Sequence, residues 1–409
     1  MDSGPSGPGG RQDAGGEPSD GRPVKLEGVR DGELIATRGR TVYRGPSPAS
    51  LRRVGRLPVP AGGVAGAGFR LRTSATLRRP LSRLVGRFPA ATVAAVDAGA
   101  LVATAGRWVF ASADGGATWR RTARLPASSG PVGVLPSALC VHEGTVHLGE
   151  YPLSAGDTAR IRVSHDAGET WETALALPEV RHVHGVARDP YTGEYWVTTG
   201  DADDECVIGR LRDGRLDPVG GGSQEWRAVQ PAFTPEYVLW GVDCNYTDEK
   251  RIYRLAREDI ADVGPGADGD LDPTPVASLS TPVFYSAAVE AGGERWVAFS
   301  TSASATPDST APGTRVTGGD GTRVVAASSA SAYTRWFEVT AARRRRGLVE
   351  RLGVDGVVPA SNAYTFLASD GRRLLVNPYN TRERDGRVLE FGPDFFESLP
   401  GRSSATVGK

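Results

Sequence analysis

A pattern of eight residues that occurs twice constrains the fold of this 409-residue chain more than any other feature. It begins at Ser112 as SADGGATW and again at Ser164, fifty-two residues later, as SHDAGETW. The shared positions are Ser112, Asp114, Gly116, Thr118 and Trp119, and in the second copy Ser164, Asp166, Gly168, Thr170 and Trp171. An Asp carboxylate accepts the N–H groups of a tight turn, Gly permits a positive φ, and Trp adds a large apolar surface. Repetition at this spacing predicts similar structural units in succession.

Short β-like runs surround both copies and continue along the chain. Runs such as 92–96, 101–104 and 108–111 are separated by turns that contain Gly, and their spacing of roughly 8–12 residues predicts antiparallel sheet. The 53 Gly and 29 Pro residues argue against long helices. Seven candidate units can be counted: 24–58, 92–126, 138–178, 182–219, 226–278, 282–345 and 361–395. Because the two ends could complete one unit together, the expected number is six or seven.

The repeated pattern resembles the Asp-box of sialidase-like β-propellers, S-x-D-x-G-x-T-W. A second resemblance, over roughly residues 90–300, is to an uncharacterised prokaryotic family of such propellers. It is carried by LCVH (139–142), GEY (149–151), RHVHG (181–185), DPY (189–191), WVTTGD (196–201) and GSQEWRAV (222–229). These resemblances imply an all-β fold, a six- or seven-bladed β-propeller of four-stranded antiparallel blades, and a carbohydrate-related function.

The domain organisation expected from composition is one propeller, residues 23–396, between two flexible tails. Residues 1–22 are rich in Gly and Pro and should be disordered, as should 397–409. Residues 61–87 fit no blade. No signal peptide or apolar run of membrane-spanning length is present, and Cys140, Cys206 and Cys244 show no metal-binding spacing. We therefore expect a cytoplasmic protein with unpaired thiols.

The charge balance limits the expected partners. Lys and Arg number 48, as do Asp and Glu, so the formal net charge is zero. A neutral chain is not expected to bind nucleic acid or an anionic membrane over a broad surface. We expect a monomer whose ligand is a carbohydrate or another small molecule.

Candidate functional residues gather where the innermost strands of propeller blades enter the central channel. His182 and His184 alternate at the start of such a strand, and period-two spacing places both on one side. Three second strands end in Gly149-Glu150, Gly200-Asp201 and Gly241-Val-Asp243, and each ending should bring a carboxylate to the same rim. The candidate catalytic residues are Glu150, Asp201, Asp243 and His184, and the candidate substrate-binding residues are Tyr151, Trp226, Arg227 and Tyr285.

Three chemistries are compatible with this set. Two carboxylates could act on a glycosidic bond as acid and base, or as acid and nucleophile. His182 and His184, with one or two carboxylates, could hold a divalent metal. Alternatively, Arg227 could bind the carboxylate of a sugar acid that the protein does not turn over.

The sialidase resemblance does not extend to the catalytic motifs of those enzymes. Their Arg-Ile-Pro-type motif corresponds at best to residues 56–58, RLP, which we interpret as a strand terminator, and no arginine triad can be assigned. The acidic run 201–205 is interpreted as a loop and not as a calcium site, and the arginine run 343–346 as a solvated segment. The expected alternatives are a glycoside hydrolase-like or lyase-like enzyme, a non-catalytic binding propeller, and a metal-dependent enzyme.

Overall fold

A computed structural model describes most of the chain between residues 23 and 399. The described ranges are 23–74, 90–97, 99–129, 133–153, 157–244, 249–261, 271–303, 321–346 and 362–399. The predicted N-terminal tail, 1–22, lies outside them, as does the predicted C-terminal tail from residue 400 onward.

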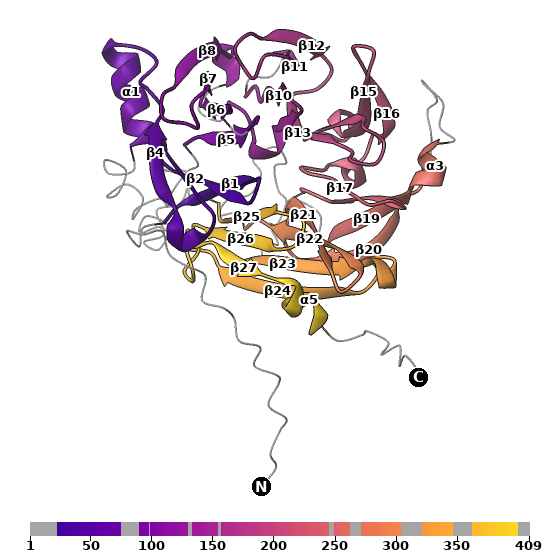
Figure 1. Ribbon diagram of the computed structural model, residues 1–409. Coiled ribbons are helices and arrows are strands. Elements are labelled where there is room, and N and C mark those ends of the chain that lie inside the picture. The colour runs from indigo at the N-terminus through magenta and orange to yellow at the C-terminus, as the bar shows by residue number, and fades with distance from the viewer. Residues whose placement is uncertain are drawn as a thin grey trace.

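Seven antiparallel sheets surround a central channel, each with its first strand innermost (Figure 1). The first three are β1 (Lys25–Arg30), β2 (Glu33–Arg38), β3 (Thr41–Gly45), β4 (Arg52–Arg56); β5 (Thr92–Ala95), β6 (Leu101–Ala105), β7 (Trp108–Ser112), β8 (Arg120–Arg124); and β9 (Leu139–His142), β10 (Thr145–Gly149), β11 (Ala159–Ser164), β12 (Glu172–Leu177).

The remaining four sheets continue the same order around the ring. They are β13 (His182–Arg188), β14 (Tyr195–Gly200), β15 (Val207–Arg212), β16 (Arg215–Gly221); β17 (Ala232–Phe233), β18 (Tyr237–Gly241), β19 (Lys250–Ala256), β20 (Thr274–Leu279); β21 (Val283–Ala291), β22 (Glu294–Thr301), β23 (Gly321–Ser328), β24 (Trp336–Arg343); and β25 (Tyr364–Ser369), β26 (Leu374–Tyr379), β27 (Leu389–Phe391).

The protein is therefore an all-β propeller with seven blades, and the predicted blade limits agree with the observed sheets. Six sheets have four strands and the seventh has three among the described residues. The first and last units form separate sheets and do not share a blade, which settles the open count at seven.

Among the described residues, helices are few and short. They are α1 (Gly63–Thr73), α3 (Arg257–Ala261) and α5 (Pro393–Glu397), with the 3₁₀ turns η1 (Pro48–Ser50), η2 (Ala127–Ser129), η3 (Pro136–Ala138), η4 (Asp203–Glu205), η5 (Gln224–Trp226) and η6 (Ser329–Ser331). Helix α1 occupies part of the stretch 61–87 that fits no blade, whereas 75–89 lies outside the described residues. In the described part of the chain, no helix has the length and apolar character needed to cross a bilayer.

The core consists of apolar layers between neighbouring blades. One layer joins Ile35 and Leu57 of the first blade to Leu101 and Phe110 of the second, and Trp119 packs against it. Trp171 packs against the equivalent layer between the second and third blades. This confirms the prediction that the Trp of each repeat lies between sheets.

The two repeated turns adopt the same hydrogen-bond pattern between the third and fourth strands of their blades. In the second copy, Thr170 donates to Asp166 through its backbone N–H (2.8 Å) and its hydroxyl (2.6 Å). Gly168 has a φ of +89°, and a Cβ there would approach Val102 Cγ2 to 2.4 Å. In both turns the Asp carboxylate accepts hydrogen bonds from the Ser and Thr of the same repeat, so its role in the described structure is to hold the turn.

Candidate functional site at the channel mouth

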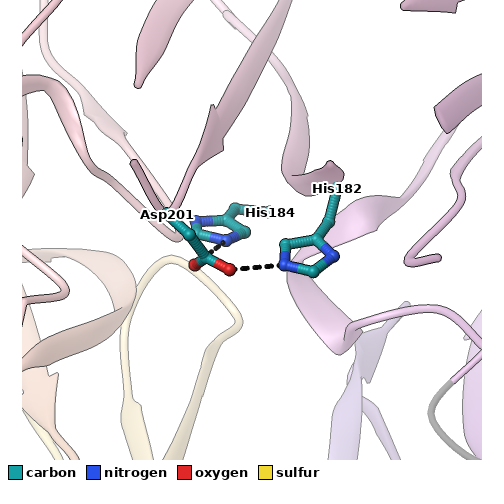
Figure 2. A group of neighbouring side chains, drawn as sticks. All are labelled: His182, His184 and Asp201. Atoms are coloured by element: carbon teal, nitrogen blue, oxygen red, sulfur yellow. Dashed lines mark hydrogen bonds and ion pairs between the residues drawn. The ribbon is translucent and has the colours of Figure 1, made fainter. Parts of the chain in front are cut away.

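The two histidines of the site come from β13, the innermost strand of the fourth blade. His182 pairs with Gly200 of β14, and the register then shifts between Val183 and Gly185, so that His184 lies in a β-bulge. A bulge turns a side chain out of the regular alternation and is frequent beside functional sites. Both imidazole rings, 5.9 Å apart between centroids, face Asp201, the residue that follows β14 (Figure 2).

The carboxylate of Asp201 is the centre of this group. Its Oδ2 lies 2.5 Å from His182 Nε2, and its Oδ1 lies 3.5 Å from His184 Nε2 and 2.8 Å from Arg227 Nη2. Burial alone would raise the pKa of Asp201. Hydrogen bonds from the two histidines and the charge of Arg227 outweigh burial and hold that pKa well below its usual range. Asp201 is therefore a permanent carboxylate.

The imidazole of His182 is fixed at both nitrogens. Its Nδ1 lies 2.5 Å from the carbonyl oxygen of Pro152, to which it must donate, and its Nε2 faces Asp201. The ring of Tyr151 stacks on it with centroids 4.0 Å apart and an interplanar angle of 5°. Both contacts are to acceptor oxygens, so the contact with Asp201 requires a proton on Nε2 as well, and a metal ion bound at Nε2 would have to replace this proton.

His184 is held by close packing. It is 1% exposed, and its Nδ1 has no hydrogen-bond partner among the described residues. A Cβ on Gly200 would approach His184 Cε1 to 3.0 Å and Arg227 Cγ to 3.1 Å. Because any larger residue would displace one of these side chains, glycine at this position keeps His184 and Arg227 against the end of β14.

Two further predicted residues, Tyr151 and Asp243, lie at the same mouth. Burial, then the negative charges of Asp201 and Asp243, raises the pKa of the Tyr151 hydroxyl far above its ordinary value. The pKa of Tyr364 is raised by burial and by Asp243 as well. The mouth thus presents protonated phenol groups beside the ionised carboxylate of Asp201.

The other predicted residues have different positions. Glu150 is fully buried, and its Oε1 accepts a hydrogen bond from Arg162 Nε of β11 at 2.6 Å. Trp226 is buried and stacks on Trp240 inside the fifth blade. The guanidinium of Arg227 is 5% exposed and binds Asp201, which leaves it little surface for a ligand carboxylate. Roles for Glu150 and Trp226 in chemistry stay predictions.

The channel also contains residues that the sequence did not single out. A cavity of about 110 Å³ is lined by residues of several blades. The predicted residue Tyr285 is among them, and the others include Glu27, Thr92, Ser137, Gln230 and Phe366. Glu27 binds Lys25 at 2.8 Å, and burial raises its pKa despite that partner. The sequence does contain a feature that distinguishes Lys25. It is one of three lysines in a chain whose other 45 basic residues are arginine.

The acidic run 201–205 contributes to the structure of the mouth. Residues Asp203–Glu205 form η4, where Glu205 pairs with Arg181 at 3.3 Å and Asp203 accepts a hydrogen bond from Gln224. Among the described residues, the group that could hold a metal is His182, His184 and Asp201, whose ligand atoms all lie within 4.8 Å of one another.

The fold and this group of residues define the protein as a seven-bladed β-propeller with a polar His–Asp site at its channel mouth. No protein-family model matches the chain, and no curated protein matches it in sequence. Solved structures are similar to it in fold at low identity.

Three of these structures illustrate the similarity. A puromycin-hydrolysing peptidase of Mycobacterium tuberculosis has a TM-score of 0.49 at 13% identity, over 90% of this chain and 53% of that one. A sialidase of Trypanosoma rangeli has a TM-score of 0.43 at 14% identity, over 89% of this chain and 59% of that one. An ancestral GH74 enzyme has a TM-score of 0.42 at 10% identity, over 93% of this chain and 54% of that one. This chain therefore matches somewhat more than half the length of each.

Proposed function

We propose that this propeller is a metal-dependent enzyme in which His182, His184 and Asp201 bind a divalent transition metal, and that its substrate is a carbohydrate. The observation that carries the proposal is the convergence of two imidazole nitrogens and one carboxylate within 4.8 Å at the channel mouth. Mixed nitrogen and oxygen ligands suit Zn²⁺, Mn²⁺ and Fe²⁺. The carbohydrate class rests on the resemblance of the repeated turns to those of sialidase-like propellers.

The surroundings of His182 fit a metal ligand. A ligating histidine ordinarily donates its second N–H to a carbonyl or carboxylate, which fixes the tautomer and the orientation of the ring. The Pro152 carbonyl occupies that position at 2.5 Å from Nδ1. Ligands about 2.1 Å from a shared ion lie roughly 3–4 Å apart. The three ligand atoms all lie within 4.8 Å of one another, and His182 Nε2 and Asp201 Oδ2, 2.5 Å apart, would have to separate to admit an ion.

A bound divalent metal would supply a Lewis acid and lower the pKa of a coordinated water. The protein's own residues would orient the substrate. Tyr151 keeps its proton at neutral pH because its pKa is raised, so its hydroxyl can donate a hydrogen bond to a sugar oxygen. Asp243, 9% exposed at the same mouth, can accept one. Arg227 positions Asp201 through contacts at 2.8 and 3.1 Å.

Metal analysis tests the proposal directly. The protein is stripped with a chelator, and binding of Zn²⁺ and Mn²⁺ is then measured by titration calorimetry and elemental analysis. We expect one metal per chain, and loss of at least about tenfold in affinity in His182→Ala and Asp201→Asn. His165→Ala, a histidine with an exposed side chain, is the matched control and should bind as the parent does. A parent protein that binds neither ion, or that binds it no more tightly than His182→Ala and Asp201→Asn do, overturns the proposal.

One observation favours a second candidate, a non-catalytic glycan-binding site. Asp201 already has a cationic partner in Arg227, with which a metal ion would compete. In that case the His–Asp–Arg group would hold the mouth in shape, and Tyr151 with Asp243 would bind the sugar. Glycan binding that is unchanged by the chelator and lost in Tyr151→Phe would support this candidate over the metal-dependent one.

A further inference from the structure

Arginines are concentrated on one side of the ring, although the chain as a whole is neutral. Residues 34–126 contain 16 arginines, no lysine and two acidic residues, Asp97 and Asp114, which gives a net charge of 16 − 2 = +14. Since the whole chain sums to zero, the other residues carry −14. The described part of this stretch forms most of the first two blades and helix α1, which lies beside β4 (Figure 1), whereas residues 75–89, with four of the arginines, lie outside the described ranges.

Several of these guanidinium groups lie near one another. Burial first, then the charges of Arg56 and Arg70, lowers the pKa of Arg40. On the second blade, Arg121 and Arg124 lie over the ring of Trp108 at 5.3 and 4.9 Å from its centroid. We call the following set the arginine face: Arg40, Arg52, Arg53, Arg56, Arg70, Arg107, Arg121 and Arg124.

Backbone carbonyls, and not carboxylates, hold this face in place. Arg40 donates to the carbonyl of Leu57 at 2.9 Å, Arg107 to that of Leu125 at 3.1 Å, and Arg121 to that of Pro60 at 3.0 Å. Within the described ranges, no carboxylate forms an ion pair with any of the eight arginines. Their mutual repulsion is therefore not compensated within the described structure, and a polyanion would relieve it.

An exposed apolar side chain distinguishes between kinds of polyanion. Leu71 lies between Arg70 and Arg72 on α1 and is 54% exposed. It would gain little beside a nucleic-acid backbone, but it can enter the boundary between headgroups and acyl chains. The aromatic ring of the face, Trp108, already stacks with two guanidinium groups and offers no free platform for a base.

We infer that the arginine face, with Leu71, docks on an anionic lipid surface. Basic residues are attracted to such a surface and an inserted leucine adds a smaller apolar contribution. The His182, His184 and Asp201 group belongs to the fourth blade, whereas the arginine face belongs to the first two blades and α1. The inference does not depend on what the mouth binds.

Vesicle co-sedimentation of the full-length protein tests it. We expect binding to vesicles of phosphatidylcholine with phosphatidylglycerol, none to phosphatidylcholine alone, and loss of binding as added salt screens the charges. The triple variant Arg53→Gln, Arg56→Gln, Arg70→Gln should bind roughly a hundredfold more weakly, at about fivefold per arginine. Leu71→Ser should weaken binding less.

The matched control removes three arginines from the fifth and sixth blades: Arg251→Gln, Arg323→Gln and Arg335→Gln. It should bind vesicles as the parent does, and both triple variants should keep the parent unfolding temperature. Three results would each overturn the inference. The protein could bind uncharged vesicles as well as anionic ones, the control triple variant could lose as much binding as the test variant, or the protein could bind duplex DNA and not vesicles.

Discussion

Asp201 is the residue that holds the polar side chains of the channel mouth together. Two imidazoles and a guanidinium converge on one carboxylate that is 14% exposed. A buried carboxylate is stable as an anion only when partners of this kind surround it. Removing its charge would therefore disturb His182, His184 and Arg227 together, so single substitutions here are not expected to have additive effects.

Gly200 provides a test of this geometry in which none of the interacting side chains is itself substituted. In Gly200→Ala, the new methyl group would meet His184 and Arg227 at about 3 Å and displace one of them. We expect metal affinity to fall by about tenfold or more while the protein stays folded. Gly28→Ala, where no atom lies within 4 Å of the added carbon, is the control. Unchanged affinity in Gly200→Ala would contradict the proposed packing.

The repeated turns should make the free energy of unfolding depend on pH in the acidic range. Hydrogen bonds from Thr170 and Ser164 lower the pKa of Asp166 from 3.8 to about 2. A carboxylate whose folded pKa lies below its unfolded value stabilises the protein above the unfolded pKa, and this contribution disappears as the pH falls from about 4 to about 2.

Asp166→Asn should therefore be less stable than the parent at neutral pH, and the difference should shrink over that acidic range. Denaturant unfolding at a series of pH values measures it. A difference between the two proteins that is independent of pH would show that the charge of Asp166 does not stabilise the turn.

At the scale of elements, β-bulges in the innermost strands bring polar groups to the channel. The register shifts at Leu26/Gly28 in β1, at Val183/Gly185 in β13 and at Val283/Ser286 in β21. Glu27, His184 and Tyr285 lie at these shifts, and each lines the cavity or the mouth. Regular alternation along a strand could not predict which side such residues face.

A buried ion pair joins the hairpin of the fourth blade to the fifth blade. Asp189, with a fully buried side chain, accepts two hydrogen bonds from Arg257 at 2.6 and 2.9 Å. Asp189→Asn would leave Arg257 without its partner and should lower the free energy of unfolding by about 3 kcal/mol. Asp213→Asn, in an exposed turn, should change it little. Equal unfolding midpoints for the two variants would refute a structural role for the pair.

At the scale of the whole molecule, the ring is closed by contacts between the first and seventh blades and not by a shared blade. The backbone N–H of Leu26 in the first blade donates to Asn377 Oδ1 in the seventh at 2.9 Å, and Asn377 Nδ2 donates to the carbonyl of Arg387. Apolar residues of both blades, including Val24, Leu34, Leu375 and Val388, pack around this junction. The backbone N–H of Val24 also donates to the carbonyl of Gly386 at 3.0 Å, so closure combines the buried Asn377 amide, this backbone bond and a small apolar cluster.

Asn377→Ala tests this junction. It leaves a buried N–H and a buried carbonyl without partners and should cost about 1–3 kcal/mol of stability. Hydrogen exchange should increase first in β1 and β26, because they lose their shared contact. An increase distributed evenly over all seven blades would contradict the idea that the ring opens at this junction.

The blade pattern could be predicted because it is local. Each blade contains alternating short runs and Gly-bearing turns, and the observed sheets begin and end within a few residues of the predicted units. The site was predicted in part for the same reason. His182, His184, Asp201, Tyr151 and Asp243 stand at the ends of strands, and strand ends of neighbouring blades meet at one rim.

The sequence by itself determined the fold class and the residues that reach the channel mouth, because both depend on strand order and turn chemistry. Only the tertiary structure decided the partners: Glu150 binds Arg162, Arg227 binds Asp201, and Lys25 binds Glu27 inside the channel. It also decided that the number of blades is seven. These features depend on which blades become neighbours in space, and that information is not local to any stretch of the chain.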